Sequence, residues 1–122
     1  MEKAKALAAL AALANDARLD LVRLLMPQGD QGLAAGEIGR ALGLSASRLS
    51  FHLAALEQAG LIRSRKLARN VFYSVDAGGM GATIAFLLND CCMEHPEVVA
   101  CCRHGKPVTE PAIQTPEQPS VS

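Results

Sequence analysis

The sequence EIGRALGLSASRLSFHLAALEQAGLI, residues 37–62, has the pattern of two short helices joined by a tight turn. Apolar residues at helical spacing continue up to Gly43, which interrupts the first helix. Ser45 is a residue type that caps helix N-termini, and Gly60 suits the left-handed position at a helix C-terminus. The pattern predicts a helix-turn-helix, whose second helix can enter the major groove of DNA. The apolar stripe of that second helix consists of Leu49, Leu53 and Leu56.

If the leucine stripe faces the core, the opposite face of the second helix is exposed. That face carries Phe51, one of only four aromatic residues in the chain, and an exposed ring there fits a thymine methyl or another apolar surface. The alternative is that Phe51 packs against the hairpin that follows. The polar residues nearby can hydrogen-bond to phosphates or base edges. The predicted DNA-binding residues of this helix and its cap are Ser45, Ser47, Ser50 and Phe51, with Arg48 and His52 at the flanks.

Two short strands are predicted next, over residues 61–66 and 70–75, because apolar and polar side chains alternate there. The segment between them, RSRKLARN, is a basic hairpin tip. A basic hairpin after a helix-turn-helix is the wing of a winged helix, and its cations supply salt-sensitive contacts to phosphates. The predicted DNA-binding residues of the wing are Arg63, Arg65, Lys66 and Arg69.

The charges are unevenly distributed, although the net charge is zero. Residues 39–75 contain six basic residues and one acid, whereas six acids and two basic residues follow from Asp76 onward. A basic middle region beside a predicted helix-turn-helix indicates a local polyanion site. The alternative is an ordinary solvated face.

The remaining segments predict a mainly α-helical fold with a β-hairpin wing. Residues 2–14 form an Ala-rich helix, a second helix is capped by Asn15 or Asp16, and a third begins near Leu33 or Ala34. The expected core residues of the second helix are Leu19, Leu21, Val22, Leu24 and Leu25.

A last helix is predicted from about Ala77 through Cys92. It is apolar on more than one face, so it needs a second surface to cover it, and we expect a homodimer built from this helix and the first one. The expected organisation is a dimeric DNA-binding domain over residues 1–92, a cysteine segment over residues 90–104 and a disordered, Pro-rich tail over residues 105–122.

The composition excludes several classes of protein. No apolar run approaches the length that crosses a bilayer and no signal peptide is present, which predicts a cytoplasmic protein that does not enter the membrane. An enzyme that used the thiols would need a substrate pocket and an activated nucleophile, and no such signature occurs. We therefore expect a non-enzyme.

All four cysteines lie within twelve residues, in CCMEHPEVVACC. In a cytoplasmic protein such clustering favours metal or redox chemistry over structural disulfides. Neighbouring cysteines on a regular helix point about 100° apart, so one ion could bind both only if the helix frays, which Pro96 favours. The stretch MEHPEVVA would then bring a third thiol back. The predicted ligands are Cys91, Cys92, Cys101 and Cys102, with one of the last two as the third sulfur.

Three converging thiols suit a soft ion such as As(III) or Sb(III), which takes three sulfurs in a pyramid. Zinc or cadmium would want a fourth ligand, which His95 or His104 would complete. Two further interpretations stay open, namely a thiol oxidation switch and simple free thiols.

The chain resembles the ArsR/SmtB family of winged-helix, metal-sensing transcriptional repressors over roughly residues 4–92. The resemblance rests on LANDARLDLVRLL (13–25), residues 37–62 and RKLARNVFYSV (65–75), and its most specific pattern is SxSxxSxHLxxLExAGL from Ser45 to Leu61. It implies that the ligand-free dimer binds double-stranded operator DNA and represses it, and that an inducer lowers this affinity.

The sequence departs from two known sensor types of that family. Arsenic sensors with cysteines on the helix before the turn are not matched, because LAAGEIGRAL (33–42) contains no cysteine. Zinc sensors carry Asp and His ligands along the last helix, and Asp90 alone does not complete that set. The cysteine pairs instead resemble arsenite sensors with C-terminal thiols. They predict an arsenite-responsive repressor, with cadmium, zinc, thiol oxidation or methylated trivalent arsenicals as alternative signals.

Overall fold

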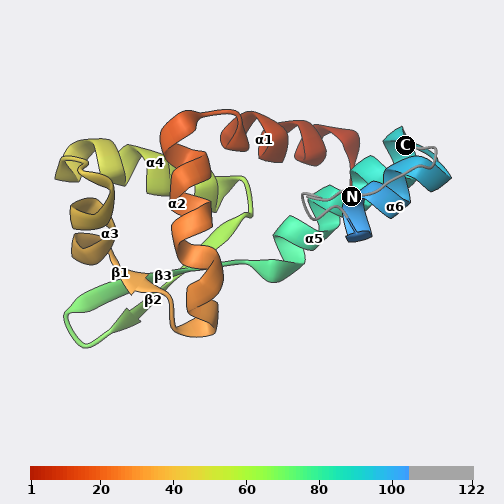
Figure 1. Ribbon diagram of the computed structural model, residues 1–122. Coiled ribbons are helices and arrows are strands. Elements are labelled where there is room, and N and C mark those ends of the chain that lie inside the picture. The colour runs from red at the N-terminus through yellow and green to blue at the C-terminus, as the bar shows by residue number, and fades with distance from the viewer. Residues whose placement is uncertain (105–122) are drawn as a thin grey trace. The chain divides into compact units, whose positions relative to one another are not determined.

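The computed structural model describes residues 1–104 of the 122-residue chain. They fall into two compact units, Met1–Ile84 and a second unit from Ala85 onward, each described here by itself. The elements are α1 (Lys3–Leu13), α2 (Asp16–Leu25), the 3-10 segment η1 (Met26–Gln31), β1 (Leu33–Ala34), α3 (Ala35–Leu42), α4 (Ala46–Gln58), β2 (Ile62–Leu67), β3 (Asn70–Val75), α5 (Ala77–Phe86), the π-helical segment η2 (Leu87–Cys91) and α6 (Pro96–His104). The predicted fold class, a winged helix-turn-helix, is confirmed (Figure 1).

Helix α2 begins as expected, because the side-chain oxygen of Asn15 accepts a hydrogen bond from the backbone N–H of Arg18 at 3.1 Å. Of its predicted core residues, Leu21, Val22 and Leu25 are buried and Leu24 packs against the core from a half-buried position. The prediction was wrong for Leu19, which is 47% exposed because it lies on the flank of the helix outside the buried stripe.

The segment before α3 differs from expectation. Leu33 and Ala34 form a short strand that pairs antiparallel with β3, so the sheet has three strands in the order β1-β3-β2. Gly32 makes this pairing possible, because a Cβ at that position would overlap the carbonyl oxygen of Tyr73. Helix α3 then starts at Ala35, one or two residues later than predicted, with the Glu37 carboxylate accepting from the N–H of Ala34 at 2.9 Å.

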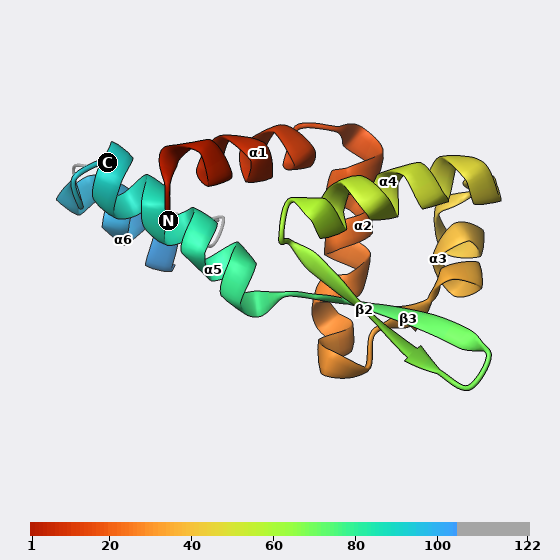
Figure 2. The same ribbon diagram turned by 180° about the vertical axis from the view of Figure 1, so that it is seen from behind.

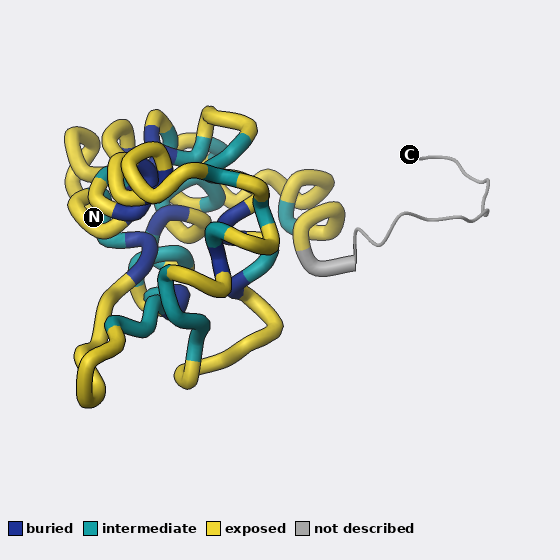
Figure 3. Tube along the Cα trace, turned by 90° about the vertical axis from the view of Figure 1, so that its left-hand side faces the viewer, coloured by how far each residue is buried: buried dark blue, intermediate teal, exposed yellow. Residues whose placement is uncertain are grey.

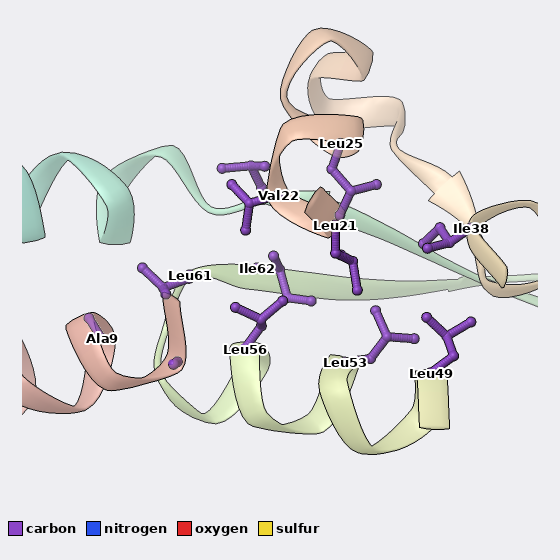
Figure 4. Packing of buried hydrophobic residues seen from close by; sticks show 12 residues of the cluster. Ala9, Leu21, Val22, Leu25, Ile38, Leu49, Leu53, Leu56, Leu61 and Ile62 are labelled. Atoms are coloured by element: carbon purple, nitrogen blue, oxygen red, sulfur yellow. The ribbon is translucent and has the colours of Figure 1, made fainter. Parts of the chain in front are cut away.

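The helix-turn-helix follows the sequence closely. Gly43 ends α3 in the left-handed conformation, with φ 66°, and the Ser45 side chain caps α4 by accepting from the N–H of Arg48 at 3.3 Å. Gly60 follows α4 with φ 79°. The leucine stripe of α4 points toward residues of α2, α3 and β2, which together form the core of this unit (Figure 4). The buried stripe comprises Leu49, Leu53 and Leu56.

The wing is the hairpin of β2 and β3, which extends away from the helices (Figure 2). Its base is anchored by Ile62 opposite Val75, both buried, whereas residues 63–70 are exposed. Burial is therefore concentrated where the helices and the wing base meet (Figure 3).

The last predicted helix is shorter than expected and is followed by another. Helix α5 ends at Phe86, a π-helical turn continues to Cys91, and Met93 and Glu94 have positive φ values of 51° and 54°. Helix α6 then starts at Pro96, a residue that suits a first helical turn. The predicted disordered tail lies outside the described residues. Within residues 1–104, no helix combines the length and apolar character of a membrane span.

Candidate nucleic-acid interface and cysteine segment

The outward face of α4 presents the side chains that the sequence placed there. Ser47, Ser50 and Ala54 are exposed, and the Phe51 side chain is 64% exposed. The Phe51 ring contacts Arg18 and His52, and the residue stays 64% exposed, so it is not buried against the hairpin as the alternative prediction required. This face combines small hydroxyl groups with one apolar ring, which suits a base edge and a thymine methyl in a major groove.

His52 is a correction to the predicted outward set. It is only 7% exposed, and its Nδ1 accepts a hydrogen bond from the Nε of Arg18 at 3.1 Å. The helical turn places it beside the leucine stripe, where α2 covers it. Burial, together with the charges of Arg18 and Arg48, lowers the pKa of His52 from its ordinary value of 6.5.

Arg48 and Ser45 lie at the start of α4. The Arg48 side chain is exposed and makes no salt bridge within the described residues, so its guanidinium is available to an anion. The Ser45 hydroxyl is engaged as the helix cap. The N-terminal end of a helix attracts phosphate, because its first N–H groups lack intrahelical partners.

The four basic residues of the wing are not equivalent. Arg63 pairs with Asp30 at 3.2 Å, and Arg65 approaches the carbonyl oxygen of Gln31 at 3.5 Å while its guanidinium lies 5.9 Å from the Phe72 ring centre. Lys66 and Arg69 lie exposed near the tip. All four side chains are exposed, and Arg63 is the one that pairs with an acid among the described residues.

One hydrogen bond ties the wing to the end of α4. The Ser64 hydroxyl donates to the Glu57 carboxylate at 2.8 Å, linking β2 to the last turn of the helix. The base of the wing is therefore joined to the C-terminal end of α4.

The cysteines lie at the end of η2 and on α6. Cys91, Cys101 and Cys102 are exposed, Cys92 is half-buried, and all four are free thiols. The pKa of Cys92 is raised, chiefly by its interaction with Cys91 and then by burial. Among residues 1–102, whose side chains the structure describes, no three Cys, His, Asp or Glu side chains lie together as a metal-ion site. Cys91 and Cys92 are thus adjacent at the end of η2, whereas Cys101 and Cys102 lie on α6.

Sequence reasoning did not find two residues of this surface. Arg18 reaches α4 from a position 34 residues earlier in the chain, and Asp30 reaches Arg63 across 33 residues. No local pattern signals either contact, because both depend on how α2 and η1 pack beside α4 and the wing.

Comparison with known proteins agrees with this geometry. A helix-turn-helix domain model matches residues 13–65. The chain is 43% identical to the transcriptional activator HlyU of Vibrio cholerae over 71% of this chain and 80% of that protein. It is 41% identical to the HTH-type transcriptional regulator YgaV of Escherichia coli over 72% of this chain and 87% of YgaV.

Solved structures show the same architecture. Reduced HlyU from Vibrio cholerae superposes with a TM-score of 0.57 and 40% identity, covering 73% of this chain and 90% of HlyU. The homodimeric winged helix-turn-helix domain of a possible ArsR-family transcriptional regulator from Mycobacterium bovis has a TM-score of 0.59 and 28% identity, covering 75% of this chain and 82% of that one.

Proposed function

Because this chain belongs to the ArsR-like winged helix-turn-helix transcriptional regulators, we propose that it is an arsenite-responsive repressor that binds operator DNA as a dimer and releases it when As(III) binds C-terminal thiols. The observation that carries this proposal is one chain with two parts: an exposed reading helix beside a basic wing, and four free thiols after α5. The Vibrio cholerae relative is named an activator, so the test also asks whether this protein represses or activates transcription.

The proposed DNA surface consists of the outward face of α4, the start of that helix and the wing. Ser47, Ser50 and Phe51 face bases, and Arg48 faces phosphate, while the wing follows the adjacent backbone. Arg65, Lys66 and Arg69 supply most of the salt-dependent affinity, because Arg63 is already paired with Asp30.

The proposed dimer uses apolar side chains that the protomer leaves exposed on α1 and α5. Leu7 on α1 is 56% exposed and Ile84 on α5 is 44% exposed. The Mycobacterium bovis relative is homodimeric, which supports this assignment. A twofold dimer would present two α4 helices to two half-sites of a palindromic operator.

The proposed inducer site is built on the Cys91–Cys92 pair. Arsenous acid, As(OH)3, exchanges its three hydroxyl groups for three thiols and releases three water molecules, so the exchange requires no net change in protonation. Cys101 or Cys102 would supply the third sulfur after a local rearrangement. Zinc, by contrast, requires deprotonated thiolates and a fourth ligand.

The start of α5 lies directly against the end of the reading helix, which supports a route for control. The N–H of Asp76 donates to the carbonyl of Leu61 at 2.9 Å, and the Asp76 side chain caps α5 at the N–H of Gly79 at 3.1 Å. Gly79 packs so closely on Gly60 that a Cβ would overlap the Gly60 carbonyl oxygen. A displacement of α5 would therefore be felt at the C-terminal end of α4.

The test is a binding titration on a DNA duplex obtained by in vitro selection with the full-length, inducer-free protein. Arsenite should lower the affinity by about 5–150-fold, the range of a coupling free energy of about 1–3 kcal/mol. If arsenite leaves the affinity unchanged while cadmium, zinc or an oxidant releases the DNA, then that agent and not As(III) is the inducer. A promoter reporter with and without arsenite separates repression from activation.

A methylated trivalent arsenical is the second candidate inducer, and the Cys91–Cys92 pair favours it. Such a compound has only two exchangeable oxygens and so needs two thiols, which the adjacent Cys91 and Cys92 would supply. A Cys101→Ser/Cys102→Ser double variant separates the candidates: it should lose the response to arsenite but keep the response to methylarsenite. Loss of both responses would exclude this second candidate.

A further inference from the structure

The side chain of Phe51 is held in an unusual setting for an exposed aromatic ring. It is 64% exposed, and it lies on the same face of α4 as the hydroxyl groups of Ser47 and Ser50. Leaving so large an apolar surface in water is unfavourable, so the ring calls for a partner that is not part of the protomer fold.

Arg18 keeps this ring in place from outside the helix-turn-helix. Its guanidinium carbon lies 5.4 Å from the Phe51 ring centre, within the range of a cation–π contact. The same guanidinium donates through Nε to the buried His52 at 3.1 Å, and the backbone N–H of Arg18 bonds to the α2 cap residue Asn15. The backbone of Arg18 is thus held at the start of α2, and its guanidinium is held by His52 on α4.

His52 completes the arrangement. Its ring meets the Phe51 ring edge to face, with centres 5.7 Å apart and planes inclined by 65°. Because His52 is buried and bonded to Arg18, it cannot turn outward without breaking that bond. Phe51 therefore has a restricted set of orientations before any DNA arrives, and preorganised groups lose less entropy on binding.

The major groove offers one apolar group at base edges, the C5-methyl of thymine. We propose that Arg18 is a positioning residue that presents Phe51 to a thymine methyl group within each operator half-site. This inference rests on the proposed DNA-binding function but not on the identity of the inducer. It assigns a specificity role to Phe51 and an indirect role to a residue of α2, without any contact between Arg18 and DNA.

The first experiment replaces thymine by deoxyuridine, one position at a time, in a duplex selected with the full-length protein. Deoxyuridine removes only the methyl group and leaves the hydrogen-bonding pattern intact. We expect one position in each half-site where the affinity falls about fourfold, the value of one buried carbon. In Phe51→Ala that position should no longer distinguish thymine from deoxyuridine.

The second experiment asks whether Arg18 acts through Phe51. Arg18→Ala should bring the thymine-to-deoxyuridine ratio close to one while leaving the dependence of affinity on salt unchanged. Arg23→Ala is the matched control, since Arg23 is exposed on the same helix and pairs only with Asp20, and it should keep the fourfold ratio. Arg18→Lys keeps the charge but lacks the Nε donor to His52, so its thymine-to-deoxyuridine affinity ratio should also fall close to one. This variant replaces Arg18→Ala if that one proves unstable.

Each result decides a separate point. A duplex with no methyl-dependent position, or a dependence that persists in Phe51→Ala, overturns the assignment of Phe51. A salt slope that falls by about one unit in Arg18→Ala shows a direct phosphate contact and overturns the positioning role. Failure of the selection to yield any bound duplex removes the DNA-binding premise itself, whereas a failed arsenite response leaves this inference intact.

Discussion

Helix α4 with its wing and the cysteine segment (residues 90–104) are held by different kinds of contact. The reading face is fixed by side chains distant in sequence: Arg18 reaches Phe51 and His52, and Asp30 reaches Arg63. Around the cysteines, the described contacts join near neighbours, such as the N–H of Cys92 with the carbonyl of Leu87. The outward face of α4 is thus held in advance by contacts distant in sequence, and under the proposed function the thiol site would be assembled only when its ligand binds.

The largest effect on stability and DNA binding should come from disturbing the contact between Gly79 on α5 and Gly60 at the end of α4. Gly79→Ala forces a Cβ into the Gly60 carbonyl, and we expect a loss of about 1–3 kcal/mol in the free energy of unfolding, with weaker DNA binding. Urea denaturation measures the first effect and DNA titration the second.

Gly81→Ala is the control for that change, because nothing lies within 4 Å of a Cβ at Gly81 on the same helix. It should be neutral or stabilising by up to about 1 kcal/mol, as expected for alanine in a helix. Equal behaviour of the two variants would show that the close approach of Gly79 to Gly60 does not matter.

Removal of the Cys91 and Cys92 thiols should leave DNA binding intact and abolish the response of DNA affinity to arsenite. Cys91→Ser/Cys92→Ser is expected to bind the selected duplex like the unmodified chain while losing the whole arsenite effect of about 5–150-fold. Anisotropy titrations with and without arsenite measure both quantities. A double variant that still releases DNA with arsenite would exclude the pair as ligands.

A smaller effect is expected from one charge on the wing. Arg65→Ala should weaken binding to all duplexes by a similar factor and reduce the salt slope by about one unit, because one phosphate contact is lost. Arg23→Ala, which changes a charge on α2 outside this surface, should leave the slope unaltered. An unchanged slope in Arg65→Ala would remove Arg65 from the DNA surface.

The smallest effect concerns pH and the buried His52. Its pKa is lowered in the folded state below the ordinary value of 6.5, so the folded protein favours the neutral ring. The resulting stability is fully present above pH 6.5 and is lost as pH falls from 6.5 through the lower folded-state pKa. Protonation also removes the Nδ1 lone pair that accepts from Arg18.

The measurement is the urea midpoint as the pH is lowered through that window. His52→Gln, which is neutral and keeps an acceptor, should show a smaller drop. His95→Gln, a change at an exposed position of the cysteine segment, should behave like the unmodified chain. An equal drop in His52→Gln would show that another group governs the acid sensitivity.

The sequence by itself determined the elements whose stability is local. The Ser45 cap, the break at Gly43, the left-handed Gly60 and the leucine stripe of α4 all follow from backbone chemistry or helical period, and each was predicted. The cap of α2 was predicted at Asn15 or Asp16 and lies at Asn15. The outward position of Phe51 followed from the same periodicity.

Tertiary structure decided what periodicity cannot express. Two residues on the flanks of their helices, Leu19 and His52, were assigned to the wrong side, because the neighbouring elements set where the boundary of burial falls. The pairing of β1 with β3 and the reach of Arg18 to Phe51 join residues more than thirty positions apart, and no local preference encodes such contacts. The outward residues of α4 could thus be named from sequence, whereas the contacts that hold the Phe51 ring depend on how α2 packs beside α4.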